Sequence, residues 1–386
     1  MSGAEVVGTV WDQLPASPAI DALAAGIKAG RTQHAWLLLG PRGAQKVPAA
    51  RALAAAALCS ELPGTGCGRC RSCRRVARGS HPDLHHVRPE GPLIPVDLIR
   101  EGVVAEATRS PFESDLNVFI IEESDRMNEA AQNALLKTLE EPPADSIFIL
   151  TADQEEELLI TVRSRCRVVY LEPVSEETVS DILRGAGVGG DEAALASRIF
   201  EGDLRAALAF GRGESIAERR RAWASIPGRL ESSASALDAA AEILDQVDVA
   251  TREHAEAQKL EVTELAEALG EARGTATARN ALLARHKREL RRVEEEVLSE
   301  AFLFLGGFYR DVFLIREGKT DRITNLDLVG ELSDWARSAA APVDLVRAME
   351  TCAQAAAAIP RNANRQLVVE SALLQLVGLR RATVPT

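Results

Sequence analysis

Short apolar runs alternate with segments of helical periodicity from the start of the chain to about residue 175. Short apolar runs bounded by polar or turn-forming residues are typical of buried strands. The predicted strands are Ala35–Leu39, Leu84–Val87, Asn117–Ile121, Ser146–Thr151 and Arg167–Leu171. The predicted helices of this region are Ile20–Ala29, Val47–Cys59, Asp97–Thr108 and Asn128–Glu140. Strands that alternate with helices indicate a parallel sheet with both faces covered.

After Val174 the pattern becomes purely helical. Ser175 is a suitable N-cap for a first short helix, and further short helices are expected at Asp191–Phe200 and Asp203–Phe210. From residue 214 to the end every segment has helical character. We therefore expect an α/β plus all-α protein with three domains. They are an α/β domain at 1–174, a small helical lid at 175–213 and a larger helical domain at 214–386.

A strongly charged segment at about 250–296 interrupts the helical domain. Mixed charges at this density are typical of a solvated helical hairpin or a partly disordered insertion, although a projection that contacts a partner or DNA is the alternative. After this segment, apolar residues return at helical spacing. This stripe, expected to face neighbouring helices, consists of Leu298, Ala301, Phe302, Leu305, Tyr309, Val312 and Phe313.

Composition excludes several classes of protein. The chain has 386 residues, a formal net charge of −12 and only 4% aromatic residues, so it is not an electrostatic DNA binder as a whole. No apolar run long enough for a membrane span is seen, and the first residues lack the basic and apolar regions of a signal peptide. Six cysteines in a chain of this length do not suggest a disulfide framework. We expect a cytoplasmic protein.

The strand ending at Leu39 runs into a degenerate phosphate loop. A working loop has the pattern G-x-x-x-x-G-K-[ST], in which backbone N–H groups cradle phosphates and the hydroxyl binds Mg²⁺. Here Gly40, Gly43 and Lys46 remain, but Gln45 replaces the second glycine and Val47 replaces the hydroxyl residue. Because Val cannot ligate Mg²⁺, ATP hydrolysis is not expected. Nucleotide binding through Lys46 stays open.

Four closely spaced cysteines follow the helix after this loop. Cys59, Cys67, Cys70 and Cys73 have the spacing C-x7-C-x2-C-x2-C. Four thiolates on a short loop suit a structural, tetrahedral Zn²⁺ and leave no ligand position for a substrate water. His81, His85 and His86 lie close enough in sequence to replace one ligand. Free surface thiols are the alternative.

Arginines surround these cysteines at positions 69, 71, 74, 75 and 78. A basic loop can contact nucleic acid, but arginines of this kind more often remain solvated or pair with acidic surfaces.

Adjacent carboxylates end the strand Asn117–Ile121. An apolar strand followed by Glu122 and Glu123 resembles a Walker B element, in which an Asp holds the metal and a following Glu orients water. Glu122 stands where Asp is expected. The alternative, weighed equally, is an acidic loop at the end of a strand.

Two further motifs follow in order. One is the run from Asn133 to Pro143, NALLKTLEEPP, and the other is Ser164-Arg165-Cys166 after the next strand. Together with the cysteine insertion they resemble the clamp-loader branch of the AAA+ proteins. That branch includes the tau/gamma and delta-prime subunits of bacterial DNA polymerase III. The resemblance covers about residues 10 to 213 closely and the rest only by helical character. A damaged phosphate loop beside a kept SRC arginine resembles delta-prime rather than tau/gamma.

The resemblance implies an AAA+ RecA-like sheet with a zinc-knuckle insertion, a helical lid and a carboxyl-terminal helical collar. It also implies that Glu122, Glu123, Thr151 and Arg205 line the nucleotide site. Arg205 belongs to the lid motif Gly202-Asp203-Leu204-Arg205, and the alternative is that it is only a cation on a helix surface. Arg165 would act in trans as an arginine finger on a neighbouring subunit's ATP.

The implied function is that of a non-hydrolysing clamp-loader subunit in DNA replication. Its implied partners are tau/gamma and delta subunits, a sliding clamp and, through the assembly, primer–template DNA. Two alternatives remain: an active ATPase of the tau/gamma type and a stand-alone zinc-containing DNA-binding protein.

Overall fold

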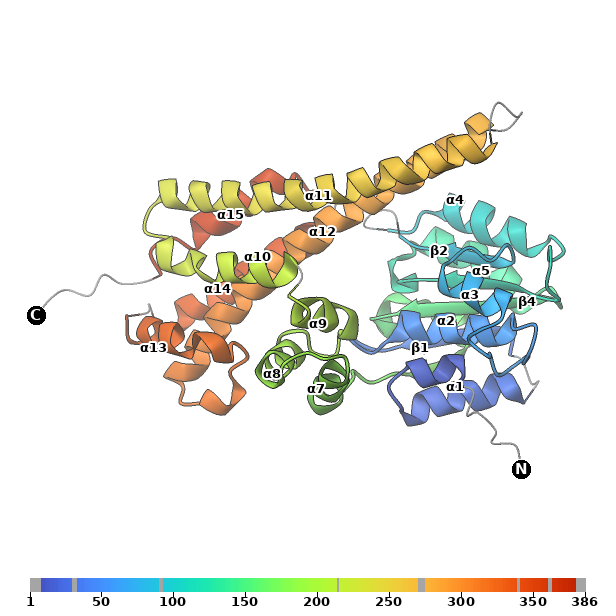
Figure 1. Cartoon of the computed structure of the whole chain (residues 1–386), viewed down its shortest axis with the longest axis horizontal. Coiled ribbons are helices and arrows are strands. Elements are labelled where there is room, and N and C mark those ends of the chain that lie inside the picture. The colour runs from blue at the N-terminus through green and yellow to red at the C-terminus, as the bar shows by residue number, and fades with distance from the viewer. Residues whose placement is uncertain are drawn as a thin grey trace, which may run out of the picture. The chain divides into compact units, whose positions relative to one another are not determined.

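The computed structural model describes residues 8–29, 33–89, 93–213, 215–269, 275–338, 341–359 and 363–379. The chain forms two compact units, Met1–Leu208 and Ala209–Thr386 (Figure 1). The first unit carries a sheet and the second is built from helices. The three-domain division expected from the sequence remains a prediction.

A five-stranded parallel sheet forms the centre of the first unit, with the strand order β2-β3-β4-β1-β5. The strands are β1 (Ala35–Leu39), β2 (Leu84–Val87), β3 (Asn117–Ile121), β4 (Ser146–Ala152) and β5 (Arg167–Tyr170). In the register, Ala35 of β1 lies opposite Phe148 of β4, and Trp36 lies opposite Arg167 of β5. Every residue of β1, β3 and β4 is buried, as expected for strands covered on both faces.

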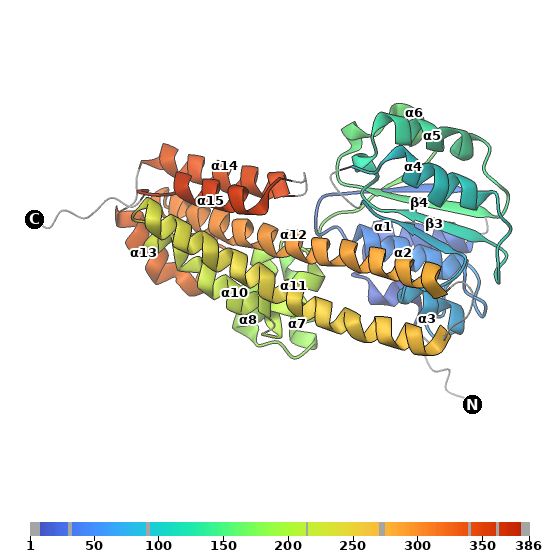
Figure 2. The same ribbon diagram turned by 90° about the horizontal axis from the view of Figure 1, so that it is seen from above.

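Alternate residues of each strand enter two separate apolar layers. In β1, Trp36 and Leu38 pack on one face with helices α1 (Pro18–Lys28), α2 (Lys46–Ala57) and α3 (Arg71–Ala77). Leu37 and Leu39 pack on the opposite face. The elements on that face are α4 (Val96–Ile99), η2 (Arg100–Ala105), α5 (Glu129–Glu140) and α6 (Ile160–Arg163). Figure 2 shows the two sets of helices on opposite faces of the sheet.

Helix starts follow ordinary capping rules. Ser17 accepts a hydrogen bond from the Ile20 amide at 3.3 Å and Pro18 occupies the first turn of α1, while Asn128 accepts from the Ala131 amide at 2.8 Å at the start of α5. Most elements expected from the sequence lie within two residues of the observed bounds. The predicted helix Asp97–Thr108 differs, because a π-helical turn, η2, follows α4.

Three short helices follow the sheet: α7 (Glu176–Gly185), α8 (Gly190–Ile199) and α9 (Leu204–Gly211). Ser175 caps α7 by accepting a hydrogen bond from the Thr178 amide, as expected. Val179 and Leu183 of α7 are fully buried, and α7 packs against α8. These helices occupy the region predicted as a lid.

The second unit contains α10 (Ser215–Ala224), α11 (Ser233–Leu269), α12 (Thr275–Arg316), α13 (Val329–Ser338), α14 (Pro342–Ala358) and α15 (Arg365–Gln375). Helices α11 and α12 lie side by side, α14 packs on α12 and α15 packs on α11 (Figures 1 and 2). The apolar stripe expected after Val297 is buried from Leu298 to Val312, and only Phe313 at its end is half-buried.

The charged segment at about 250–296 lies in α11 and α12, except for residues 270–274, which lie outside the described residues. Exposed pairs within one helix, such as Arg292 with Glu296 at 2.9 Å, agree with a solvated surface. The Gln258 side chain of α11 reaches across to α12, where it donates to the Glu289 carboxylate at 2.9 Å and to the His286 carbonyl at 3.4 Å.

A buried guanidinium links α10 to the segment before α13. Arg220 is 2% exposed and donates to both carboxylate oxygens of Asp327 at 2.7 Å and to the Asn325 side-chain oxygen at 2.7 Å. A bidentate pair with an additional acceptor is the arrangement that a buried arginine requires.

Candidate functional site

The carboxyl ends of β1, β3 and β4 carry the residues predicted for nucleotide chemistry. The phosphate loop follows β1, Glu122 and Glu123 follow β3, and Thr151 lies near the end of β4. The chain leaves β1 toward one edge of the sheet and leaves β4 toward the other. Ligands of open α/β sheets bind where connections diverge in this way. The phosphate loop, Glu122, Glu123 and Thr151 therefore lie at the carboxyl ends of neighbouring strands, and their contact with a nucleotide stays a prediction.

The phosphate loop is closed by the chain itself. Gln45 adopts a left-handed conformation with φ of 55°, the position that favours glycine in a working loop. Its side-chain nitrogen donates to the carbonyl of Gly202 at 3.0 Å and is 3.4 Å from the carbonyl of Gly43. A Cβ on Gly43 would lie 2.5 Å from the carbonyl oxygen of Glu201. The segment Glu201–Gly202 thus packs directly against the loop that would cradle phosphates.

Lys46, the remaining residue of the motif, is also satisfied internally. Its ammonium donates to the carbonyls of Gly40 at 2.5 Å and Pro41 at 2.7 Å, and pairs with Asp153 at 2.8 Å. The Lys46 side chain is only 10% exposed. An ammonium has three donors, and three oxygens of the chain accept from it. A phosphate would have to displace these contacts.

The Walker B position is occupied by an internal ion pair. The buried Glu122 accepts from the His86 ring at 2.6 Å and pairs with Arg88 at 3.2 Å. Burial lowers the pKa of His86, and the hydrogen bond that the ring donates to Glu122 opposes that effect. Because His86 lies on β2, Glu122 is held toward the edge of the sheet. It contacts neighbouring side chains of the unit rather than standing free as a metal ligand.

The other predicted nucleotide contacts have structural partners as well. Thr151 is buried, and its hydroxyl accepts from the Glu123 amide at 3.1 Å. Glu123 pairs with Arg126 at 2.6 Å. Arg205 is exposed in the first turn of α9.

Arg165, the predicted finger, lies at the surface just after α6. One guanidinium nitrogen donates to the Thr161 carbonyl at 2.8 Å, and the other pairs with Glu140, the last residue of α5. The Arg165 side chain is 31% exposed and that of Glu140 is 48% exposed. The guanidinium is therefore oriented by the chain but remains open to solvent on one side.

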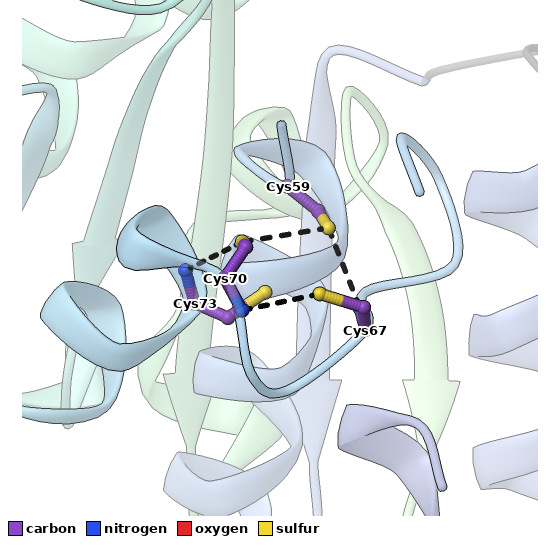
Figure 3. A group of neighbouring side chains, drawn as sticks. All are labelled: Cys59, Cys67, Cys70 and Cys73. Atoms are coloured by element: carbon purple, nitrogen blue, oxygen red, sulfur yellow. Dashed lines mark hydrogen bonds between the residues drawn. The ribbon is translucent and has the colours of Figure 1, made fainter. Parts of the chain in front are cut away.

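The four predicted zinc ligands come together in one buried cluster (Figure 3). Their sulfur atoms all lie within 4.8 Å of one another, and those of Cys59 and Cys70 are 3.8 Å apart. Four sulfurs about 2.3 Å from one ion would be about 3.8 Å apart in a tetrahedron. The side chains therefore fit a structural zinc ion, and neither His81, His85 nor His86 belongs to the cluster.

Backbone amides surround the cluster and favour the thiolate form. The amides of Cys67, Cys70 and Cys73 each donate to the sulfur of another cysteine of the cluster at 3.3 Å. Burial opposes ionisation of Cys70, but hydrogen bonds from the Cys73 amide and from Ser60 outweigh burial and lower its pKa to about 6. Burial raises the pKa of Cys67 and Cys73. A bound cation would provide the charge that such clustered thiols need to ionise.

Tight turns bring the cysteine loop back onto the unit. Gly66 has φ of 78°, and a Cβ there would lie 2.6 Å from a methyl group of Val10. Two arginines of this region are paired with acidic side chains. Arg75 pairs with Glu113 at 2.6 Å, and Arg69 is 3.7 Å from Glu61. The structure thus provides acidic partners for part of the basic loop.

Sequence reasoning missed the residues that occupy or orient the predicted site. They are His86 and Arg88 beside Glu122, Asp153 beside Lys46, and Glu140 beside Arg165. Asp153 had a usable signal, because it follows the carboxyl end of β4, and the phosphate loop follows the carboxyl end of the neighbouring strand β1. The pairs of Glu122 and Arg165 carry no such signal in the pattern.

Strand order and the place of the phosphate loop define an AAA+ fold of the RecA-like type, as expected from the sequence. Residues 16–175 match the family described as DNA polymerase III, delta subunit. Over this region, the chain is similar to bacterial DNA polymerase III clamp-loader subunits.

Individual relatives match over the same part of the chain. DNA polymerase III subunit delta' of Bacillus subtilis is 34% identical over 50% of this chain and 58% of its own length. Subunit delta' of Escherichia coli is 36% identical over 51% of this chain and 60% of its own length. Subunit tau of Salmonella typhimurium is 33% identical over 49% of this chain and 30% of its own length. The chain thus spans less than two thirds of these relatives.

None of the helices in the described ranges is both long and apolar enough to cross a membrane.

Proposed function

We propose that this chain is a clamp-loader subunit that does not hydrolyse ATP and instead supplies Arg165 to a neighbouring ATPase subunit. The observation that carries this proposal is the contrast between two cations. Lys46 is nearly buried and satisfied by three oxygens of its own unit, whereas Arg165 is held at the surface with part of its guanidinium exposed. Lys46 is therefore not available to bind a phosphate, whereas the guanidinium of Arg165 is accessible to the phosphate of a neighbouring subunit.

Phosphoryl transfer needs positive charge on the oxygens of the leaving phosphate, and an arginine supplied in trans contributes about 10³–10⁵ in rate where it has been dissected. The chain's own site has lost the parts that would carry out this reaction. Val47 cannot bind Mg²⁺, and Glu122 is paired with His86 and Arg88. The chain therefore acts on ATP bound to its neighbour and not on ATP of its own.

The partners in this proposal are tau/gamma and delta subunits, assembled through the helical unit as a collar. The complex holds a sliding clamp at primer–template DNA during cytoplasmic DNA replication. A structural Zn²⁺ held by the four cysteines stabilises the insertion beside α2. Similarity to both delta' and tau relatives supports membership of this assembly.

The test is reconstitution of the complex from this chain and its tau/gamma and delta subunits, followed by size and ATPase measurement. We expect the isolated chain to lack ATPase activity, and Arg165→Ala to lower the DNA-stimulated rate of the complex without preventing assembly. Robust turnover by the isolated chain would support the active-ATPase alternative. Salt-sensitive DNA binding by the isolated chain would support the stand-alone DNA-binding alternative.

A further inference from the structure

The contact between Glu140 and Arg165 joins two elements that the sequence separates by 25 residues. Glu140 is the last residue of α5, and Arg165 follows α6. The same guanidinium also donates to the Thr161 carbonyl at 2.8 Å and lies 3.5 Å from the Ser164 hydroxyl. Carboxylate and carbonyl contact different nitrogens of the group, so that its plane is fixed from two sides.

The position of Glu140 at the end of α5 does not stabilise that helix. A carboxylate at the carboxyl end of a helix lies near the partial negative charge of that end, which is unfavourable. Arg165 offers the compensating positive charge. In the part of the chain that the structure describes, Glu140 is the carboxylate that forms an ion pair with Arg165.

We propose that Glu140 is the positioning residue of the finger: its carboxylate accepts a hydrogen bond from Arg165 and holds the guanidinium ready for a neighbour's phosphate. This inference rests on the proposed function. Arginine has a long side chain with several freely rotating torsions. Fixing these torsions before the reaction lowers the entropy that is lost on reaching the transition state.

The exposure of the pair allows this contact to be given up. The Arg165 side chain is about one-third exposed and the Glu140 side chain about one-half. An ion pair with this exposure is weak, because solvent screens it. Arginine binds a phosphate in bidentate, charge-assisted fashion, which is a stronger interaction than an exposed pair. The neighbour's nucleotide can thus recruit Arg165 from Glu140, whereas a buried pair would have retained it.

The test uses the reconstituted full complex and compares Glu140→Ala with Glu140→Gln. Alanine removes the hydrogen-bond acceptor, so we expect kcat of the DNA-stimulated ATPase to fall about three- to fivefold. The KM for ATP stays within about twofold, because a finger acts mainly on the transition state. Glutamine keeps an oxygen that can accept the same hydrogen bond, and therefore retains at least about half of the wild-type kcat.

Glu141→Ala is the matched control, since it removes the same charge from the neighbouring position while Glu140 keeps its ion pair with Arg165. A second control is the double variant Arg165→Ala with Glu140→Ala. If Glu140 acts through Arg165, its removal has no further effect once Arg165 is absent. A merely structural role would lower the rate in both backgrounds.

Three results would overturn the inference while leaving the proposed function intact. They are an unchanged kcat in Glu140→Ala, an equal loss in Glu140→Gln, and an equal further loss in the Arg165→Ala background. An unchanged rate in Arg165→Ala alone is a different result. It would contradict the proposed function itself, and this inference with it.

Discussion

The side-chain amide of Gln45 donates a hydrogen bond to the backbone carbonyl of Gly202, which lies 157 residues further along the chain, at 3.0 Å. Gln45 occupies the place of a phosphate-loop glycine, and Gly202 precedes α9. The substitution that removes the conformational freedom of the loop therefore also supplies a contact that closes it. The departure from the phosphate-loop pattern at Gln45 thus adds a hydrogen bond between two distant segments of the first unit.

Two substitutions at Gln45 separate the energetic cost of its left-handed backbone conformation from the contribution of its side-chain hydrogen bond to Gly202. Gln45→Ala removes the hydrogen bond but keeps a Cβ at φ of 55°, whereas Gln45→Gly removes both. We expect the Gly variant to be the more stable of the two by about 1 kcal/mol, because only glycine adopts this conformation without strain. Chemical denaturation monitored on the first unit measures the difference. Equal stability of the two variants would show that the loop carries no strain at this position.

Zinc analysis tests the cysteine cluster. We expect about one Zn²⁺ per chain in protein purified without chelators, since four sulfurs can supply one tetrahedral site. Cys70→Ser should lose the metal and lower the thermal midpoint by roughly 10 °C, because binding free energy of a structural zinc is folding free energy. Cys166→Ser, which changes a cysteine outside the cluster, should keep the metal. Metal-free wild-type protein of unchanged stability would exclude a zinc site.

Asp83 should make the first unit sensitive to acid. Its buried carboxylate accepts hydrogen bonds from the backbone amides of Phe112 at 2.5 Å, Glu113 at 3.0 Å and Ser114 at 2.8 Å. Burial raises the pKa of Asp83, but these hydrogen bonds outweigh burial and hold it below the usual 3.8. A carboxyl with a lowered folded pKa stabilises the fold above its unfolded pKa, and this stabilisation is lost as the pH falls through the folded value.

The matching variant is Asp83→Asn, which should destabilise the unit by about 2 kcal/mol at pH 7. The difference in the free energy of unfolding between wild type and Asp83→Asn should shrink as the pH falls below about 3.8. Calorimetric midpoints at pH 7 and near pH 3 measure it, with Asp115→Asn as the control, because Asp115 is an exposed carboxyl that directly follows the Phe112–Ser114 segment. A difference that does not change with pH would exclude ionisation of Asp83 as its cause.

The fold was predictable because its signals are local. Five apolar runs form the five strands, and Ser175 caps α7 where the sequence predicted an N-cap. The π-helical turn at Arg100–Ala105 was not predicted, because such turns are rare and apolar residues at helical spacing predict an ordinary α-helix.

The candidate site was predictable only in part. The residues of Gly40–Val47 and the four cysteines were recognisable because their chemistry depends on spacing along the chain. The acceptors of Lys46 and the partners of Glu122 were not, because those contacts join side chains brought together by the sheet. Pairings between distant residues leave no periodic trace in a single sequence.

The most direct measurement of the central claim is the DNA-stimulated ATPase rate of the reconstituted complex carrying Arg165→Ala. Arg165→Lys is the second variant, because lysine keeps the charge but not the planar, bidentate donor set. The account predicts an assembled complex whose rate falls about tenfold or more in the Ala variant, with at most partial recovery in the Lys variant. An assembled Arg165→Ala complex with the wild-type rate would contradict the account.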